Sequence, residues 1–438
     1  MRGKSFVPAS QGPIVNVPYR AITECRICSG HRLEPYFDLG VLPLVDALLE
    51  SDTTDEPRAP LSVAFCRDCA HSQLRHAVNP ELLFSEYPYH SSVSRTFREH
   101  CRELGVEIRT LFSERSRPRC LDLASNDGCL LREFRELGFE ILGVEPARNL
   151  AREANDNGIP TVNTFWGAEA AARLLDEHGR FDVVTATNVL AHVVDVHSFV
   201  AGVASVLQPG GLFVLEVPYA RNLLRETQFD TIMHEHQSYF LLRPLIQLLG
   251  RHGLAVARVD EKEIHGGTIR LRAVLRTGDA SYDADSGARA LLDRECDEGL
   301  WQPDAYRELE GRARRIREDF RALIGQLRAD DRIVAAYGAS GKGNIFVNSC
   351  GIGAEEIRFI VDDTKDKQGK LYPGARIPIV ASDRLRTERP DYLVLLAWNF
   401  AREIMERTAG FEEAGGRYII AIPEVRVLNS RTASETRA

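Results

Sequence analysis

The sequence predicts an α/β protein with a small cysteine-rich N-terminal domain followed by two Rossmann-like domains. Residues 1–88 predict the first domain, because they are rich in Pro, Cys and His and show no sustained helical period. Residues 89–284 and 285–438 predict the other two, because apolar strand-like runs alternate there with helix-like stretches. Such alternation is typical of parallel, doubly wound sheets. A chain of 438 residues is also long enough for about three domains.

Composition and charge exclude several classes of protein. With 44% hydrophobic and 27% charged residues, the chain is neither disordered nor collagen-like nor a coiled coil. A net charge of −8 makes nucleic acid a poor partner, because an acidic surface repels phosphates. No apolar run reaches the ~20 residues that a membrane span needs, so we expect no membrane partner. The N-terminus has no apolar signal core, and we therefore expect a cytoplasmic protein.

The N-terminal cysteines predict a metal site. Cys25 and Cys28 form one CxxC pair, and Cys66 and Cys69 form another. Four thiolates suit a closed, tetrahedral Zn²⁺ site, which would stabilise a region with little core of its own. Disulfides, unrelated thiols and iron in the same site are the alternatives. We predict structural zinc, since four thiolates leave no open position for catalysis.

The middle domain begins with a strand, a tight turn and a helix that lack the dinucleotide signature GxGxxG. The strand ends in LDLA at 121–124 and the turn reads SNDG at 125–128. Glycines let the backbone approach a pyrophosphate. S-adenosylmethionine (SAM) has no phosphate, and it needs acceptors for its cationic groups instead. The turn therefore favours SAM over a dinucleotide, with another ligand of a generic Rossmann-like domain as the alternative.

Polar residues at two further strand ends extend this predicted site. Glu145 ends the second strand, where a carboxylate accepts hydrogen bonds from ribose hydroxyls. Asn188 and His192 lie at the carboxyl end of the fourth strand, the edge at which open sheets bind ligands. We predict that all three contact the cofactor.

Four reactive side chains follow the fifth strand within six residues. They are His234, Glu235, His236 and Tyr239. A neutral imidazole is well suited to remove a proton near pH 7, so the segment predicts acid–base chemistry. If the segment is extended, alternation places His234 and His236 on one side and Glu235 on the other. There are two alternatives. One is a metal site, for which no third ligand is identified, and the other is a pair of histidines with a purely structural role.

The C-terminal domain carries a glycine-rich turn with a lysine. The sequence YGASGKGN at 337–344 follows a strand and begins a helix, which suits an anionic diphosphate. The spacing is neither that of a Walker A motif nor a clean GxGxxG. Asp362 and Asp363 end the next strand, so NAD is an alternative ligand of this turn. A turn with a purely structural role is the other alternative.

Motifs in a fixed order across the chain resemble one known family. They are CRIC at 25–28, CRDC at 66–69, YPYHSSVS at 87–94, LDLASNDGCLL at 121–131, GVEPA at 143–147, HEHQSYF at 234–240, YGASGKGN at 337–344 and LAWNFAREI at 396–404. The chain is similar to SAM-dependent sugar C-methyltransferases that act on nucleotide-linked 4-keto-deoxysugars. This resemblance implies deoxysugar biosynthesis, as in antibiotic pathways, and a substrate that we expect to be dTDP-linked.

The resemblance also implies a role for each motif residue. The residues expected around the methionine part of SAM are Asp122, Ala124, Asn126 and Gly128, with Glu145 on the ribose. His236 matches the base that removes the C3 proton of the sugar. The residues expected to support it are His234, Glu235 and Tyr239, with Tyr89 near the substrate. The residues expected to hold the nucleoside diphosphate are Gly338, Ser340, Lys342 and Asn344.

One position departs from the family pattern. The family usually has tyrosine before HEH, and this chain has Met233, whose thioether neither donates nor accepts a proton. The substrate, the face of methylation or the reaction could therefore differ. An O- or N-methyltransferase, an NAD-dependent sugar oxidoreductase and a silent binding protein are the alternatives. The sequence leaves open the sugar, the nucleobase and the oligomeric state, a monomer included.

Overall fold

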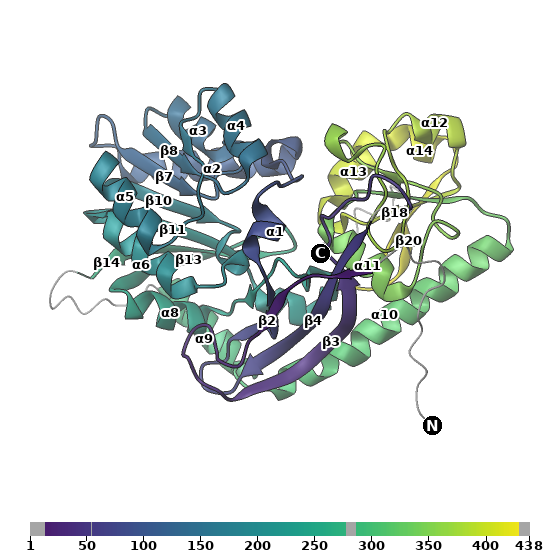
Figure 1. The fold of residues 1–438 in the computed structure, drawn as a ribbon, viewed down its shortest axis with the longest axis horizontal. Helices are drawn as coiled ribbons and strands as arrows, with labels where there is room; N and C mark the ends of the chain where they lie inside the picture. Colours follow the sequence, from purple (N-terminus) through teal and green to yellow (C-terminus); the bar gives the residue numbers. More distant parts are fainter. Residues whose placement is uncertain (1–13, 54, 277–285, 429–438) are drawn as a thin grey trace.

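The computed structural model describes residues 14–53, 55–276 and 286–428, and it contains three larger sheets. Two α/β lobes lie on either side of the long N-terminal strands β3 (Leu33–Pro43) and β4 (Glu56–Cys66), as Figure 1 shows. The predicted α/β class, with a cysteine-rich N-terminal part and two Rossmann-like sheets, is confirmed. The predicted boundary after residue 284 falls outside the described residues.

The N-terminal sheet, which we call the head, includes a strand from the middle of the chain. Its order is β1-β4-β5-β12, and β3 pairs with β4. The further strands of the head and its helix are β1 (Ile14–Asn16), β5 (Ser72–Leu74), β12 (Ser238–Tyr239), the β2–β6 ribbon (Tyr19–Ala21 and His76–Val78) and α1 (Pro80–Phe84). Because β12 follows the HEH motif directly, the head holds one end of that segment.

The middle lobe has a seven-stranded sheet in the order β13-β14-β11-β10-β7-β8-β9. Its strands are β7 (Arg119–Leu123), β8 (Glu140–Val144), β9 (Thr161–Val162), β10 (Phe181–Thr187), β11 (Leu207–Pro218), β13 (Leu254–Lys262) and β14 (Thr268–Leu275). All neighbours are parallel except β14, which is antiparallel to β11 and to β13. The strand order reverses between β7 and β10, and open sheets bind ligands at the carboxyl ends of such a pair.

Helices cover both faces of this sheet. They are α2 (Arg95–Leu111), α3 (Cys129–Glu136), α4 (Arg148–Asp156), α5 (Ala168–His178), α6 (Val196–Val206), α7 (Ala220–Arg225) and α8 (Leu242–Arg251). Successive strand residues face opposite sides. Accordingly, Val183 joins the core under α2 and α3, whereas Val184 joins the larger core that includes α5 and α6.

The C-terminal lobe has a six-stranded sheet in the order β17-β16-β15-β18-β19-β20, parallel except for β20. Its strands are β15 (Val334–Tyr337), β16 (Ile360–Val361), β17 (Ile379–Val380), β18 (Tyr392–Leu395), β19 (Arg417–Ile420) and β20 (Arg426–Leu428). Its helices are α11 (Gly341–Cys350), α12 (Arg384–Glu388), α13 (Ala401–Arg407) and α14 (Ala409–Glu413).

The charged helical stretch between the lobes forms two helices, α9 (Ser286–Asp297) and α10 (Asp304–Ala329). Helix α9 ends just before Gly299, which has a left-handed backbone (φ 67°), and Pro303 is the N-cap residue of α10. Helix α10 buries an apolar stripe at helical spacing that begins with Tyr306, whose ring packs 4.7 Å from that of Phe65 in β4. It therefore joins the head to the C-terminal lobe (Figure 1).

Among the helices of the described ranges, none combines the length and apolar character that a membrane crossing requires.

Candidate active site

A cavity of about 740 Å³ lies where the two lobes and the head meet. The predicted site residues on its walls are Tyr89, Asp122, Ala124, Asn126, Glu145, Asn188, His192, Glu235, His236, Tyr239, Gly338, Ser340 and Lys342. These side chains come from the carboxyl ends of β7, β8, β10 and β15 and from the segments between strands. The volume is within the range of enzyme ligand pockets.

The turn after β7 is built around the carboxylate of Glu145. One Glu145 oxygen accepts the amide proton of Asn126 at 2.8 Å, and the other accepts that of Ala147 at 2.8 Å. Asp122 accepts the Thr185 hydroxyl at 2.6 Å. Burial raises the pKa of Asp122 and that of Glu145 to about 7. A ligand that brings an ammonium group and hydroxyl donors would stabilise both carboxylates.

Asn126 lines the cavity and also holds a neighbouring loop. Its side-chain oxygen accepts the amide proton of Ser91 at 2.9 Å, and its side-chain nitrogen donates to the carbonyl of Tyr89 at 3.0 Å. Tyr89 lines the cavity, and its hydroxyl is buried without a hydrogen-bond partner among the described residues. The turn after β7 and the YPYHSSVS motif therefore form one unit.

The end of β10 presents an unsatisfied amide. Asn188 has a left-handed backbone (φ 57°), and both polar atoms of its side chain are buried without a partner in the described structure. Buried amide groups of native proteins are almost always hydrogen-bonded, so this one fits a polar ligand. Together with the carboxylates of Asp122 and Glu145, it suits the amino-acid and ribose groups of SAM.

His236 is held as a neutral base. Its Nδ1 lies 2.6 Å from the carbonyl oxygen of Thr231. A carbonyl only accepts, so Nδ1 carries the proton and Nε2 keeps its lone pair. Burial and the nearby Lys342 ammonium lower the pKa of His236 to about 4. The ring of His192 stands edge-on to that of His236, with centroids 4.9 Å apart.

The segment around His236 is a turn and not an extended strand, which corrects the expected alternation. The amide of His236 donates to the carbonyl of Met233 at 3.0 Å, so neighbouring side chains diverge. His234 lies off the cavity wall, and its Nε2 donates to the Ala59 carbonyl of the head at 2.9 Å. Within the HEH motif, Glu235 and not His234 lines the cavity together with His236.

Glu235 is a buried carboxyl within a polar cluster. The hydroxyl of Tyr87 donates to it at 3.1 Å. Burial and the adjacent Asp46 carboxyl raise the pKa of Glu235 well above its usual value, which favours the protonated form of this carboxyl. Tyr239 also lines the cavity, and burial raises the pKa of its hydroxyl, which keeps it a proton donor.

The C-terminal turn brings backbone and a lysine to the opposite wall. Gly338 has φ of 91°, and a Cβ at this position would lie 2.7 Å from that of Ala397, so glycine is required. The hydroxyl of Ser340 caps α11 by accepting the amide proton of Gly343 at 3.1 Å. Lys342 donates to the carbonyl of His265 at 2.8 Å.

Two other predicted contact residues, Asn344 and Gly128, lie off the cavity wall. Asn344 is fully buried below the turn, where its side chain donates to the carbonyl of Pro373 at 2.9 Å. Gly128 is the left-handed N-cap of α3 and packs against Ile159 rather than the cavity. Both residues therefore shape the turns that carry the site, from the side of each turn that faces away from the cavity.

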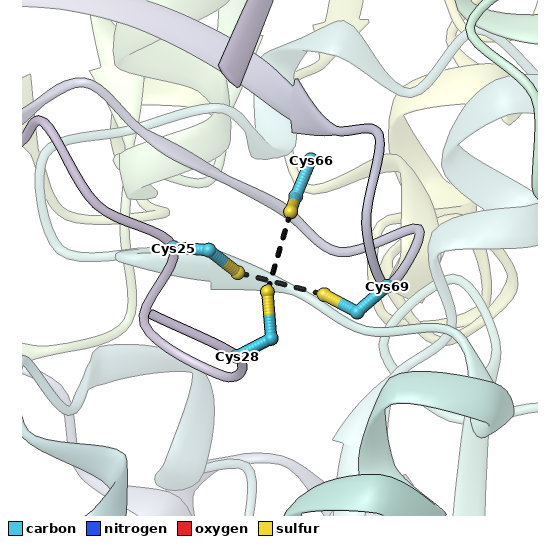
Figure 2. Close-up of side chains that lie close together, drawn as sticks. All are labelled: Cys25, Cys28, Cys66 and Cys69. Atoms are coloured by element: carbon cyan, nitrogen blue, oxygen red, sulfur yellow. Dashed lines mark hydrogen bonds between the residues drawn. The ribbon is translucent and has the colours of Figure 1, made fainter. Parts of the chain in front are cut away.

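The four predicted metal ligands meet in the head. Sγ of Cys25 lies 3.5 Å from that of Cys69, and Sγ of Cys28 lies 3.6 Å from that of Cys66. All four sulfur atoms lie within 4.8 Å of one another, and they point to one centre in Figure 2. Sulfur atoms bound tetrahedrally at about 2.3 Å from Zn²⁺ would stand about 3.8 Å apart. The donor set therefore fits zinc.

Comparison with known proteins identifies the family. The models "Putative zinc binding domain", "Methyltransferase domain" and "C-methyltransferase C-terminal domain" match residues 25–84, 95–259 and 263–423. The C-methyltransferase NovU of Streptomyces niveus is 39% identical over 415 residues, which are 94% of this chain and 98% of NovU. The chain belongs to the C-methyltransferase family. As such, it is a SAM-dependent methyltransferase with structural zinc.

Other matches cover smaller parts of this C-methyltransferase. The ubiquinone biosynthesis O-methyltransferase of Bradyrhizobium sp. (strain ORS 278) is 33% identical over 97 residues, 22% of this chain and 38% of that protein. The structure of magnesium protoporphyrin IX methyltransferase (ChlM) from Synechocystis PCC 6803 with bound SAH has 15% identity and a TM-score of 0.33. It covers 41% of this chain and 83% of that chain.

Sequence reasoning missed several residues of the C-methyltransferase site. Asp46, Tyr87 and Arg407 all line the cavity. Glu403 does too, and from the C-terminal lobe it accepts hydrogen bonds from the first amides of α2, those of Arg95 and Thr96, at 3.1 and 3.2 Å. The motif letters YPYH and NFARE contain two of these residues, Tyr87 and Glu403, and no spacing signal indicated Asp46 or Arg407.

For this C-methyltransferase, we expect the Glu145→Gln variant to bind SAM about 10–100-fold more weakly. An amide cannot accept all the hydrogen bonds of the carboxylate, and a hydrogen bond to a charged group contributes about 1.5–3 kcal/mol. Isothermal titration calorimetry with SAM measures the change. The matched control is Glu140→Gln at the exposed start of β8, which should bind SAM normally. Unchanged affinity in Glu145→Gln would contradict the ribose-binding role.

Proposed function

We propose that this C-methyltransferase methylates C3 of a nucleotide-linked 4-keto-deoxysugar, expected to be dTDP-linked, with His236 as the base. The supporting observation is that one cavity joins the carboxyl edge of the SAM-type sheet, a neutral imidazole and the N-terminus of α11. We place the reaction in the cytoplasm. None of the nine cysteines is in a disulfide bond, which agrees with a reducing compartment.

The proposed chemistry begins with a proton transfer to His236. The C4 ketone acidifies the C3 hydrogen, and Nε2 of His236 takes this proton while the electron pair moves to the C4 oxygen. Bound SAM would supply an electrophilic methyl group on a sulfonium, and the sulfur would leave as a neutral thioether. The Thr231 carbonyl stabilises the imidazolium that forms, because it accepts the Nδ1 proton. The nucleophilic carbon must be held about 3–3.5 Å from the methyl group.

A hydrogen-bond donor should stabilise the oxyanion at C4. Such a donor typically contributes about 3 kcal/mol to the transition state. Among the residues expected to support His236, His234 donates to the head, whereas Tyr239 lines the cavity. We therefore assign this role to Tyr239. The Tyr87 hydroxyl donates to Glu235, and this hydrogen bond fixes the polarity of the cavity beside His236.

The N-terminus of α11 is the proposed diphosphate site. The ammonium of Lys342 lies over the ring of Trp398, 4.8 Å from its centroid, and it faces Asp230. A positive helix end and a desolvated ammonium attract an anion strongly. The Gly338 turn adds backbone to this wall of the cavity.

Labelled SAM and a panel of nucleotide-linked 4-keto-deoxysugars test the proposal. We expect transfer of one methyl group to carbon, located by NMR, and exchange of the C3 hydrogen with solvent deuterium when SAM is absent. Methylation at oxygen or nitrogen without exchange would favour the corresponding methyltransferases, which family membership weighs against. Absorbance of a copurified nicotinamide would favour the oxidoreductase alternative.

Lys342 predicts a pH dependence of substrate binding. Burial lowers the pKa of Lys342 to about 8, although Asp230 opposes this. The Lys342 side chain is therefore charged below about pH 8, and it loses its proton and its positive charge as the pH rises above this value. We expect KM for the nucleotide sugar to rise about tenfold between pH 7 and pH 9. Lys342→Arg should remove this rise, because arginine stays charged. A KM that stays constant in the wild type would contradict the diphosphate contact.

A further inference from the structure

The segment that carries His236 takes most of its partners from the head. We define the base loop as residues 231–239. Within it, His234 donates to Ala59, and the carbonyl of Gln237 accepts the amide proton of Leu74 at 3.1 Å. Ser238 pairs with Gln73 where β12 adds to β5. The position of the base is therefore set by the head as much as by the middle lobe.

Arg26 makes the most direct connection between the metal site and the base loop. It lies between the ligands Cys25 and Cys28 and is buried. One guanidinium nitrogen donates to the side-chain oxygen of Gln237 at 2.8 Å, and another donates to the carbonyl of Leu74 at 3.0 Å. Gln237 is 211 residues away in sequence and directly follows His236.

Gln237 passes this contact on within the base loop. Its side-chain nitrogen donates to the carbonyl of His234 at 2.7 Å, so the amide bridges Arg26 and the turn before His236. The backbone on the other side is equally fixed, because the amide of Arg26 donates to Gln73 at 2.8 Å. The amide of Ile27 donates to Sγ of Cys25 at 3.4 Å, so the metal-binding turn orients the Arg26 backbone.

We propose that Arg26 is a positioning residue, which transmits the geometry of the zinc-bound Cys25–Cys28 turn through Gln237 to His236. Zinc thereby contributes to turnover without touching substrate. A buried arginine fork that binds two acceptors at once defines position better than a single contact, and a displacement of about 1 Å in a base can cost about 10²-fold in rate. That His236 is the base rests on the proposed function.

The test compares Arg26→Met and Arg26→Lys with the wild type in the full-length zinc protein. For Arg26→Met we expect bound zinc and SAM affinity to stay near wild type, kcat to fall about 10–100-fold, and KM for the sugar to change less than threefold. Backbone amides of 234–241 should exchange with deuterium faster, as measured by mass spectrometry. Arg26→Lys, which can reach one of the two acceptors, should recover part of both losses.

Arg32→Met provides the matched control. Arg32 lies in the same head, but it is exposed and pairs with Asp68 at the surface. The variant should keep wild-type kcat and wild-type exchange in the base loop. Should Arg26→Met fail to fold, Gln237→Met removes the same hydrogen bond from the other end and is expected to give the same pattern.

Two outcomes overturn the inference. One is wild-type kcat and base-loop exchange in a folded Arg26→Met or Gln237→Met variant. The other is lost activity that accompanies lost zinc or faster exchange throughout the chain, which would make Arg26 merely structural. Deuterium exchange and zinc content need no sugar substrate. If the wild type methylated no 4-keto sugar, the proposed function would fail while the link from Arg26 to the base loop would still be decided.

Discussion

Replacing His236 with asparagine is expected to lower methyl transfer about 10²–10⁴-fold, the usual contribution of a general base. Asparagine can keep a hydrogen bond to the Thr231 carbonyl, but it has no basic nitrogen. Solvent exchange of the C3 hydrogen should stop, because that step needs only the base. SAM affinity should stay within about twofold of wild type, because the proposed contacts to SAM are made by other residues.

Two measurements check this result. Proton NMR in deuterated solvent follows the C3 hydrogen of the substrate, and calorimetry gives the affinity for SAM. The comparison variant is His234→Asn, since His234 donates to Ala59 in the head and lies off the cavity wall. This variant should retain more exchange than His236→Asn, because it keeps the basic imidazole and loses only one contact between the base loop and the head. If exchange in His236→Asn continued at the wild-type rate, another group would be the base.

Parts of the site fixed by local sequence were predictable. The CxxC pairs bring their thiolates together because each pair is a single turn, and the strand ends Asp122 and Glu145 lie together because parallel strands share an edge. The side-chain directions around His236 were not predictable. The Met233–His236 turn depends on contacts with the head, and these contacts connect residues far apart in the chain.

Contacts between lobes show the same limit more strongly. Helix α2 has its own cap in Ser94, yet its first amides also donate to Glu403, which is 308 residues beyond Arg95. Arg407 pairs in turn with Glu403 and with Asp363, a residue at the carboxyl end of β16. Periodicity and motif spacing report on one segment at a time, so an ion-paired junction between two lobes leaves no signal in either segment.

Removing the metal should have an effect as large as removing the base. We expect Cys66→Ser to lose zinc, because a hydroxyl is a poor zinc ligand, and to destabilise the head. Binding of structural zinc contributes about 10–16 kcal/mol in small zinc domains, and its loss would separate the two CxxC turns that it joins. Since β12 and Gln237 depend on the head, methyl transfer should fall by more than about 10²-fold.

The metal content, the rate and the SAM affinity of this variant separate the roles of the two parts. Elemental analysis should find about one zinc per wild-type chain and almost none in Cys66→Ser. SAM binding should suffer less than catalysis, because Asp122, Glu145 and Asn188 belong to the middle lobe. Cys296→Ser, at an exposed cysteine of α9, is the control and should keep zinc and activity. Full activity in zinc-free Cys66→Ser would show that the base loop holds His236 in place without the metal.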